Sequence, residues 1–453
     1  MLDVLIVNEN QFRDIFVQKL LAEYLSKKNL RVMVVSKIIY KTSIDTLNPK
    51  IVIVPRITDD FKDIFEIKKR KNFKLFFIPC EHGAGDKDRI LAFIKSYSVK
   101  ENVITEQYKQ NLQLIEKIFV PSDFYKKILM EEKLFVDSQI LTTGTINSDL
   151  WFDDIRTIFP NKDSKKTIGI ATSFKSFMFT SSYESIQKAL YTINNFPKHG
   201  NVMFESQKHD LFFLLHEMYQ FMILSKIISD NQHLNFSMRV HPGENIKNVR
   251  NFQKQVKNVF IDRSILVQEW ISNQKVILGF SSTMLFDSTY YNVPSYSLSK
   301  MIPNEILNLL EEVKKPLNIN FLYQPATFDD LYKKLNQVDR GLEEKYIREI
   351  KEKIKISSEK NFHFPREKFA FKIIGDMIIS SLDKRSVNLF DIILLYPKIF
   401  IITLKQIKAA NFLFKYKFVM ADKIYNPLNF KKRFKIQKFV RLILEKISKL
   451  NIT

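Results

Sequence analysis

Cysteine is almost absent from this chain of 453 residues, since Cys80 is the only one. A single cysteine excludes a disulfide framework, and it excludes zinc or iron–sulfur sites that need several thiolate ligands. Glycine is scarce as well, and a total of nine glycines excludes collagen-like and glycine-linker architectures. We therefore expect a globular protein of a reducing compartment.

Long hydrophobic runs are also missing. A membrane-spanning helix needs about 20 consecutive apolar residues, and the nearest window, 389–404, contains Asp391, Pro397 and Lys398. The first seven residues are apolar apart from Asp3 and lack the basic start of a secretory signal, so they are better interpreted as a buried first strand. These observations predict a cytoplasmic protein.

The balance of residue types is that of a folded chain. Hydrophobic residues make up 45 % and charged residues 26 %, whereas disordered chains have fewer of the former. At roughly 150 residues per domain, the length allows two or three domains. A polar segment, 160–166, separates two stretches of similar pattern. We predict an N-terminal domain over 1–160, a second domain over 161–383 and a tail over 384–453.

Short apolar runs alternate with helix-like spacing in both stretches, and they predict strands. In the first domain the runs cover 3–7, 31–35, 51–54, 75–79, 118–120 and 140–142. In the second domain they cover 167–171, 236–240, 259–261, 276–279 and 295–298. This alternation indicates an α/β fold with two Rossmann-like domains, whose parallel sheets are expected to face a cleft.

The net charge of +22 is concentrated in the tail. Residues 384–453 hold 16 Lys or Arg against three acids, a net of +13, and residues 1–383 hold the remaining +9. Cations alternate with large apolar residues there, which is typical of an amphipathic anchor on an anionic membrane surface. A helical hairpin with solvated lysines also fits the pattern. Nucleic-acid binding is disfavoured, because no nucleic-acid-binding motif accompanies the charge.

Ligands of open α/β sheets bind beyond the carboxyl ends of the strands, so the residues after each strand are the candidates for chemistry. Glu81, His82 and Gly83 follow the fourth predicted strand. Either Glu81 or His82 is suited to accept a proton from an incoming hydroxyl, and glycine lets the backbone approach a ligand. Asp86 and Asp88 have the spacing of a divalent-cation site, but acids in a first helical turn need no metal to explain them. We expect no metal.

Two other strand ends carry weaker signals. In the loop after 140–142, Asn147 and Asp149 favour helix capping over ligand contact. After 167–171, several hydroxyls and Lys175 form a neighbourhood suited to phosphate, although a capped turn also accounts for them.

The second domain has the clearest phosphate chemistry. Arg239 and His241 lie at one strand end, and the proline after His241 favours an extended conformation that holds the imidazole at the sheet edge. Three consecutive hydroxyls, 281–283, follow a later strand and open a helix, where amide N–H groups and hydroxyls together suit a phosphate. Asp287 lies about one turn into that helix, within reach of a ribose or acceptor hydroxyl.

The histidine–proline pair followed by these hydroxyls resembles the C-terminal halves of GT-B-fold transferases that use CMP- or CDP-activated donors. The motifs are similar to those of the bacterial surface carbohydrate biosynthesis family. That family is related in pattern to capsule Kdo transferases, bacterial sialyltransferases and CDP-glycerol glycerophosphotransferases. The resemblance covers roughly residues 1–330, with the motifs in the same order: 12–14, 81–83, 144–150, 171–174, 239–245, 269–271 and 281–294.

The resemblance implies a role for each of these strand ends. The expected donor-phosphate and nucleotide-binding residues are Lys175, Arg239, His241, Glu244, Ser281, Ser282, Thr283 and Asp287. Among them, the histidine and the three hydroxyls are implied to contact the phosphates. Sialyltransferases place two acids before a glycine as the base, whereas this chain has Glu81 and His82 there, so the base stays open between the two.

The sequence therefore predicts a glycosyltransferase of bacterial surface polysaccharide or capsule biosynthesis. A sugar, with nonulosonates among the candidates, would pass from a CMP- or CDP-linked donor to a hydroxyl of a glycan or lipid-linked acceptor. No cofactor and no nucleic acid are expected, and the tail would hold the enzyme at the inner face of the plasma membrane. Two alternatives stay open: a transferase of a polyol phosphate such as glycerol phosphate, and a non-catalytic binding protein of the same fold.

Overall fold

The computed structural model divides the chain into two compact units. Unit 1 comprises Met1–Ile158 together with Lys355–Thr453, and unit 2 comprises Phe159–Ile354. The structure describes residues 2–9, 14–57, 61, 63–79, 90–91, 106–159, 167–172, 205–241, 246–263, 266–280, 282–308, 322–338, 343–364, 366–382, 395, 397–405, 438, 440–442 and 444–445.

The chain returns to unit 1 at Lys355, so residues 355–383 leave the second domain to which the sequence assigned them. Helix α16 (Ala370–Ser380) packs against α1 (Ile15–Lys27), and the hydroxyl of Tyr24 donates a 2.6 Å hydrogen bond to Asp376. A Cβ atom at Gly375 would lie 2.5 Å from the Tyr24 ring, so only glycine allows this close approach. Such a contact between distant segments leaves no local sequence signal.

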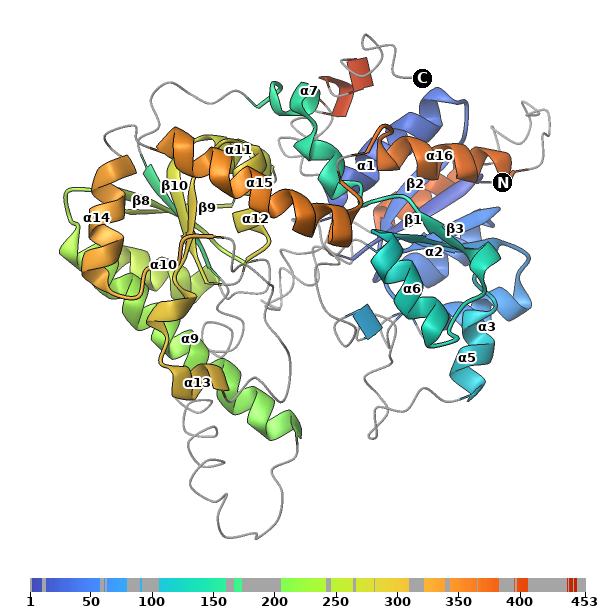
Figure 1. The fold of residues 1–453 in the computed structure, drawn as a ribbon. Coiled ribbons are helices and arrows are strands. Elements are labelled where there is room, and N and C mark those ends of the chain that lie inside the picture. The colour runs from blue at the N-terminus through green and yellow to red at the C-terminus, as the bar shows by residue number, and fades with distance from the viewer. Residues whose placement is uncertain are drawn as a thin grey trace, which may run out of the picture. The chain divides into compact units, whose positions relative to one another are not determined.

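Unit 1 is built on a six-stranded parallel sheet in the order β2-β1-β3-β4-β5-β6 (Figure 1). Its strands are β1 (Val4–Asn8), β2 (Val32–Ser36), β3 (Ile51–Val54), β4 (Lys74–Phe77), β5 (Lys117–Val120) and β6 (Ile140–Thr142). Every residue of β1 and β3 is buried. Full burial of apolar strands is expected, because helices cover both faces of a parallel sheet.

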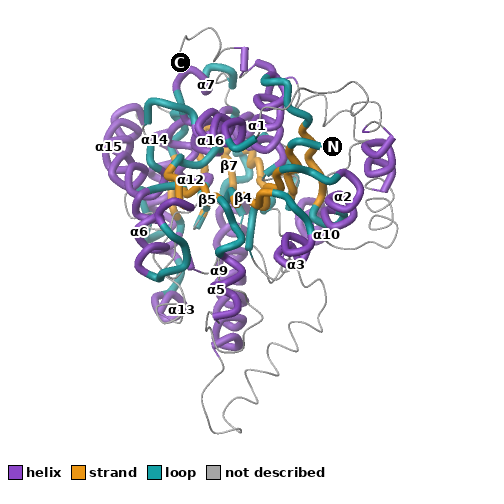
Figure 2. Tube along the Cα trace, turned by 90° about the vertical axis from the view of Figure 1, so that its right-hand side faces the viewer, coloured by secondary structure: helices purple, strands orange, loops and turns teal. Residues whose placement is uncertain are grey.

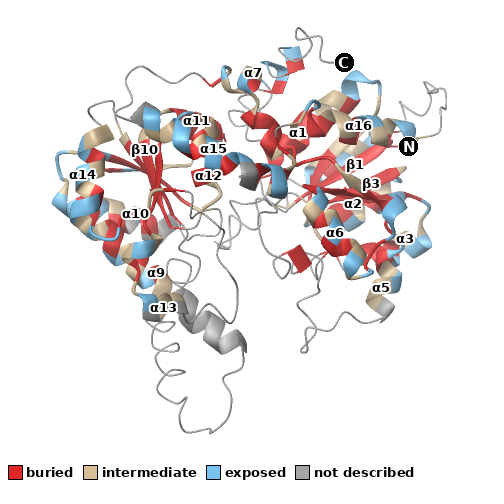
Figure 3. Ribbon diagram, in the orientation of Figure 1, coloured by how far each residue is buried: buried red, intermediate tan, exposed pale blue. Residues whose placement is uncertain are grey.

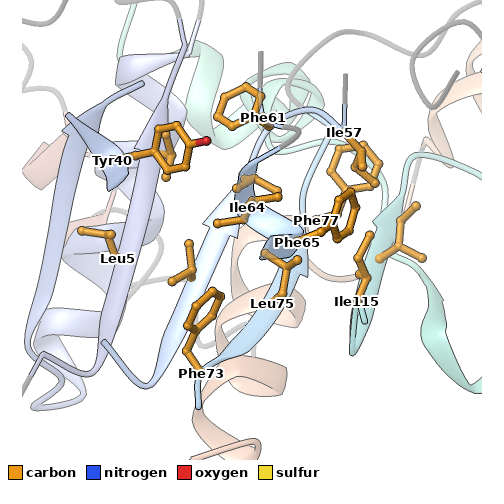
Figure 4. Close-up of a cluster of buried hydrophobic side chains, with 14 of the residues drawn as sticks. Leu5, Tyr40, Ile57, Phe61, Ile64, Phe65, Phe73, Leu75, Phe77 and Ile115 are labelled. Atoms are coloured by element: carbon orange, nitrogen blue, oxygen red, sulfur yellow. The ribbon is translucent and has the colours of Figure 1, made fainter. Parts of the chain in front are cut away.

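The helices of unit 1 cover this sheet and complete its core. Besides α1 and α16 they include α2 (Tyr40–Leu47), α3 (Asp63–Arg70), α5 (Glu106–Leu112), α6 (Asp123–Glu131) and α7 (Asp153–Arg156), with short 3-10 turns at Asp137–Gln139 and Asn147–Trp151. On one face, Leu5, Leu75 and Phe77 from the strands meet Ile64 and Phe65 from α3 (Figure 4). The strand residues alternate in sequence, as the two-residue period of a strand requires.

Unit 2 is built on a five-stranded parallel sheet in the order β11-β10-β7-β8-β9. Its strands are β7 (Thr167–Ala171), β8 (Asn235–Arg239), β9 (Val259–Asp262), β10 (Gln274–Gly279) and β11 (Ser295–Ser297). Its helices are α9 (Glu205–Asp230), α10 (Ile246–Gln255), α11 (Val267–Ser272), α12 (Met284–Tyr290), α13 (Asn304–Asn308), α14 (Phe328–Val338) and α15 (Glu343–Phe362), the last of which continues into unit 1, with a 3-10 turn at Ser299–Met301.

The predicted fold class is confirmed. All eleven strands expected from the sequence are present, with ends that shift by at most two residues. Figure 2 shows the strands enclosed by helices, and Figure 3 shows that the strands are buried while the outer helix faces are exposed. Within the described part of the chain, no helix combines the length and the apolar composition needed to cross a bilayer.

Candidate functional site

The strand order of unit 2 places a reversal point between β7 and β10. Strand β7 lies between β8 and β10, so the first connection leads to one side of β7 and a later one brings the chain back on the other side. Loops diverge at such a point and leave a ligand-binding crevice at the carboxyl edge of the sheet. Ala171 at the end of β7 is in register with Gly279 at the end of β10. The residues after these strands therefore meet at one edge.

Gly279 lets the elements approach closely at this point. A Cβ atom on Gly279 would lie 3.3 Å from the carbonyl oxygen of Ala171 and 3.4 Å from the Leu285 side chain. The glycine thus accommodates both the neighbouring strand and the first turn of α12. This packing explains one of the few glycines in the chain.

Thr172, the residue after β7, fixes the backbone at the end of β8. Its N–H and its hydroxyl both reach the carbonyl oxygen of Arg239, each at 3.2 Å. Its hydroxyl oxygen accepts a 3.2 Å hydrogen bond from the backbone N–H of His241. Thr172 is buried and His241 is half-buried. The structure therefore holds the backbone of His241 at the carboxyl edge, beside the end of β7. The contact of its imidazole with a phosphate stays a prediction.

Arg239 has a different environment from the one the sequence suggested. Its guanidinium is buried and forms an ion pair with Asp262, its partner in register on β9. Burial lowers the pKa of the Arg239 guanidinium, while the nearby carboxylates of Asp262 and Glu269 act in the opposite direction. The observed partner of Arg239 is thus a carboxylate, and its contact with a donor phosphate stays a prediction.

The turn between β10 and α12 carries Ser282 and Thr283, both half-buried. The hydroxyl oxygen of Ser282 accepts a 3.3 Å hydrogen bond from the N–H of Met284, so this serine also caps its own turn. Two further hydrogen bonds fix the start of this turn. The hydroxyls of Ser297 and Ser299 donate to the carbonyl oxygen of Phe280 at 3.0 and 2.8 Å. A fixed turn presents its hydroxyls without further ordering, which favours ligand binding.

Asp287 lies in α12 and is 5 % exposed. Its carbonyl oxygen accepts a hydrogen bond from the N–H of Tyr291. The contact of its carboxylate with a ribose or an acceptor stays a prediction.

Sequence reasoning missed three polar residues on α9, of which His216 lies beside Phe280 at the same edge. The ring of His216 meets the ring of Phe280 edge-on, with 6.4 Å between the centroids, and its Nδ1 is 2.7 Å from the amide nitrogen of Gln220. Glu217 and Gln220 are each 1 % exposed. Burial lowers the pKa of His216 to about 4, so the imidazole is neutral near pH 7. Helix α9 extends beyond the sheet in Figure 1. Its polar residues gave no signal in the sequence, because they lie within a helix and not directly after a strand.

Unit 1 has its own reversal point, between β1 and β3. A small hollow of ≈ 20 Å³, enough for about one water molecule, lies there. Its walls are mainly apolar, and they come from the ends of β1, β3 and β4, from α1 and from the loop after β6: Ile6, Val17, Gln18, Leu21, Ile53, Pro55, Ile78, Pro79, Thr145, Ile146 and Asn147. Pro79 belongs to this wall, and the segment with Glu81 and His82 follows it in sequence.

Charged groups gather at the same reversal point of unit 1. The Glu9 carboxylate, directly after β1, lies 3.0 Å from Arg56 Nε and 4.0 Å from Lys37 Nζ. These cations follow β3 and β2, so three neighbouring strand ends supply the cluster. Among these three described side chains, two cations surround one carboxylate.

The loop after β6 has a structural role. The Asp149 carboxylate accepts hydrogen bonds from the N–H groups of Ala370 and Phe371, at 2.8 and 2.9 Å, and forms a buried ion pair with Arg366. Asp149 therefore caps α16 rather than facing a ligand, in agreement with the preference for capping, but the capped helix is distant in sequence. Gly144, with φ of 77°, is needed because a Cβ there would lie 2.6 Å from Arg366 Nη1.

Several predicted site residues lie outside the described residues. They are Glu81, His82, Lys175, Glu244 and Ser281, together with the acidic pair Asp86 and Asp88. In the described ranges, no three His, Cys, Asp or Glu side chains are grouped as metal ligands would be.

No family model matches the chain, and no curated protein matches its sequence. Among solved structures, the wall teichoic acid polymerase TagF is similar, with 15 % identity, 83 % of this chain and 88 % of that chain covered, and a TM-score of 0.48. The UDP-GlcNAc 2-epimerase from Neisseria meningitidis bound to UDP-GlcNAc is similar at 13 % identity, with 84 % and 100 % covered and a TM-score of 0.44. The S. aureus MnaA–UDP structure is similar at 13 % identity, with 86 % and 100 % covered and the same TM-score. The fold class itself rests on the two parallel sheets described above.

Proposed function

We propose that this chain is a transferase of bacterial surface polysaccharide biosynthesis that takes its group from a nucleotide-activated donor. The observation that carries the proposal is that His241 and the turn with Ser282 and Thr283 follow the two strands on either side of β7, at the same carboxyl edge of the unit 2 sheet. His241 is fixed through Thr172 beside the end of β7, and the two hydroxyls follow β10 on the other side of β7. A reversal point lined by an imidazole and hydroxyls is suited to the phosphates of a nucleotide.

The donor proposed is CMP- or CDP-linked, as the resemblance of the motifs implies. His241, Ser282 and Thr283 are each able to donate a hydrogen bond to a phosphate oxygen. Donors already in place stabilise the charge that develops on the phosphate when the nucleotide departs. Ser281, Lys175 and Glu244 are proposed for the same donor on sequence grounds alone.

The proposed reaction joins the donor's transferred group to an acceptor hydroxyl. The hydroxyl oxygen of the acceptor forms a bond to the anomeric carbon of the sugar, the bond between that carbon and the phosphate oxygen breaks, and the nucleotide leaves with both electrons of that bond. The hydroxyl proton passes to Glu81 or His82, which we assign as alternative bases. Unit 1 is proposed to bind the acceptor, since Glu81 and His82 follow Pro79, which lies at its reversal point.

A polyol phosphate such as glycerol phosphate is the alternative transferred group, because His82 precedes Gly83 as a His-Gly motif does in glycerophosphotransferases. In that reaction the acceptor oxygen attacks phosphorus, and the product contains a phosphodiester. Mass spectrometry of the product separates the two reactions, since a glycosidic product contains no added phosphorus.

We further propose that the enzyme works at the inner face of the plasma membrane, where lipid-linked acceptors are made. The basic tail supports this location through its net charge of +13 over 384–453.

The test is nucleotide release from CMP- and CDP-linked donors by the full chain. Release is expected, and one of the variants Glu81→Ala and His82→Ala should lower it about 100-fold or more, the usual effect of losing a general base. Glu131→Ala, which removes an exposed carboxylate in α6, should have no effect. Absence of release with every donor would favour the non-catalytic alternative. Release that neither Glu81→Ala nor His82→Ala lowers would contradict the assignment of the base to these two residues.

A further inference from the structure

Exposed large hydrophobic side chains are concentrated in the tail. The described residues include nine such side chains, and four of them belong to the tail. Of the tail, the structure describes 395, 397–405 and six residues between 438 and 445. The four are Phe400, Ile401, Leu404 and Leu442. A short segment that presents several large apolar groups to water marks an interaction surface, whereas apolar residues scattered singly do not.

The helix at 397–405 is held to unit 1 by one face only. Ile402 is completely buried in the core of unit 1, and Ile399 packs against the same core together with Leu395. These positions are spaced by four and three residues, so they lie on one side of the helix. The buried side fixes the helix, and its other residues face outward.

The outward side combines large apolar groups with cations. Phe400 is 63 % exposed, Ile401 45 % and Leu404 40 %. Lys398 and Lys405 are exposed at the two ends of the same helix. We call Phe400, Ile401 and Leu404 the insertion surface.

The second described part of the tail repeats this arrangement. Val440 and Leu444 are buried, four residues apart, while Leu442 is 38 % exposed. Its exposed cations are Lys438 and Arg441. Two separate segments of the tail thus bury one apolar face and expose a second apolar group among cations.

We propose that the insertion surface enters the head-group region of an anionic membrane, with Lys398 and Lys405 in contact with lipid phosphates. An amphipathic helix that is too short to span the bilayer lies in the interface, where apolar side chains reach the acyl boundary and cations stay at the head groups. Each cation near an anionic leaflet contributes about 1 kcal/mol, which is about fivefold in affinity. The +13 of the tail therefore selects acidic lipids.

Charge also argues against the other occupants of this surface. A second copy of the chain would bring two tails of +13 together, and the like charges would repel. A nucleic acid would satisfy the cations but would leave three large apolar side chains in water. An anionic bilayer accommodates both kinds of group. The inference deepens the membrane location given under the proposed function, and it holds whichever group the enzyme transfers.

Sedimentation with lipid vesicles tests the proposal on the full chain. Binding to phosphatidylcholine vesicles that contain phosphatidylglycerol is compared with binding to pure phosphatidylcholine vesicles. Binding to the anionic vesicles is expected, and the triple variant Phe400→Ser, Ile401→Ser, Leu404→Ser should weaken it at least tenfold. The double variant Lys398→Gln, Lys405→Gln should weaken it as well, and added salt should weaken binding of the wild type.

The matched control is Met222→Ser with Phe260→Ser, which removes two exposed hydrophobic side chains of unit 2 that are 60 % and 53 % exposed. This control should bind vesicles like the wild type. Equal binding by the triple variant, or no preference for anionic vesicles, would overturn the proposal. A stable dimer of the wild type that the triple variant loses would overturn it too, because a second copy would then cover the surface. The thermal shift that a nucleotide induces is measured in the triple variant as well. If that shift is unchanged, a negative result in the vesicle assay contradicts the membrane proposal but leaves the proposed transferase activity standing.

Discussion

The hydroxyl oxygen of Thr172 accepts a 3.2 Å hydrogen bond from the backbone N–H of His241, although the two residues are 69 positions apart. The same hydroxyl donates to the carbonyl oxygen of Arg239. One side chain after β7 therefore satisfies a donor and an acceptor at the end of β8. The consequence is a fixed backbone at the residue that we assign to the donor phosphates.

Replacement of Thr172 by valine should separate this positioning role from the fold. The variant Thr172→Val keeps the shape but leaves the N–H of His241 without the hydroxyl, at a cost of about 1–2 kcal/mol in the free energy of unfolding. We expect a cooperative unfolding transition and about tenfold weaker nucleotide binding, measured by calorimetry. Thr157→Val is the control, since that exposed hydroxyl donates to the carbonyl oxygen of Asp154 in its own turn, away from His241 in sequence. Unchanged nucleotide affinity in Thr172→Val would contradict the positioning role.

The pair Asp149–Arg366 should be essential for the stability of unit 1. The two side chains are 2 % and 3 % exposed, and Asp149 also caps α16. Breaking a buried pair leaves an uncompensated charge, so Asp149→Asn and Arg366→Met should each cost about 3–5 kcal/mol. Urea unfolding measures this loss.

The comparison pair for this prediction is Lys127–Glu131, whose side chains are 73 % and 52 % exposed. Lys127→Met should change the free energy of unfolding by less than about 1 kcal/mol, because exposed ion pairs contribute little. A cost for Asp149→Asn as small as that would show that the C-terminal segment does not depend on this contact.

The environment of Asp3 should make the folded protein less stable in acid. Burial by itself raises the pKa of this carboxyl, but hydrogen bonds from Arg31 and Lys50 outweigh burial and lower the pKa to about 2. The folded state therefore binds the proton less readily than the unfolded state, so the contribution of Asp3 is complete above about pH 4 and is lost as the pH falls toward 2.

The variant Asp3→Asn should accordingly be about 2 kcal/mol less stable than the wild type at pH 7 and nearly equal to it at pH 2. Unfolding by urea at a series of pH values gives both numbers. Asp45→Asn, at an exposed pair with Lys71, should show no such pH dependence. If the difference in unfolding free energy between Asp3→Asn and the wild type were the same at every pH, the ion pairs of Asp3 would not be the source of the acid sensitivity.

The buried imidazole of His216 should cause a second loss of stability, at a less acidic pH. Burial lowers its pKa to about 4, below the ordinary value near 6.5, so the unfolded chain takes up a proton first as the pH falls. Stability should decrease from about pH 6.5 down to pH 4, by up to about 3 kcal/mol. The variant His216→Asn should lack this decrease, while His233→Asn, at an exposed position after α9, should retain it. The same slope in both variants would place the titration elsewhere.

Much of the fold could be predicted from the sequence because buried parallel strands leave continuous apolar runs. Ile51–Val54 and Thr167–Ala171 were predicted with the ends that the structure gives them. The return of α16 to unit 1 could not be predicted, since it depends on Asp149 and Arg366, which carry no pattern that relates them. The only signal in the sequence was Asp149 itself, an acidic residue in a loop, and it was expected to cap a nearby helix instead of the distant α16.

The candidate site was predictable where chemistry follows a strand directly. His241 and Ser282 were singled out in this way, and the sheet order places the strands that they follow at one edge, while their contact with a donor phosphate stays a prediction. Thr172 was missed as a positioning residue, because a single hydroxyl after a strand is common. His216 and Glu217 were missed because they lie within a long helix and not directly after a strand, and only the fold shows that His216 meets Phe280.

Nucleotide binding by unit 2 is the central claim, and a thermal-shift measurement on the full chain with CMP, CDP, UDP and GDP tests it most directly. A ligand at roughly 100 times its Kd stabilises the folded state by about 2.7 kcal/mol, which raises the Tm by a measurable amount. We expect CMP or CDP to raise the Tm of the wild type and of His233→Ala, and His241→Ala to lose the shift. No shift with any nucleotide, or an equal shift in His241→Ala, would contradict the account.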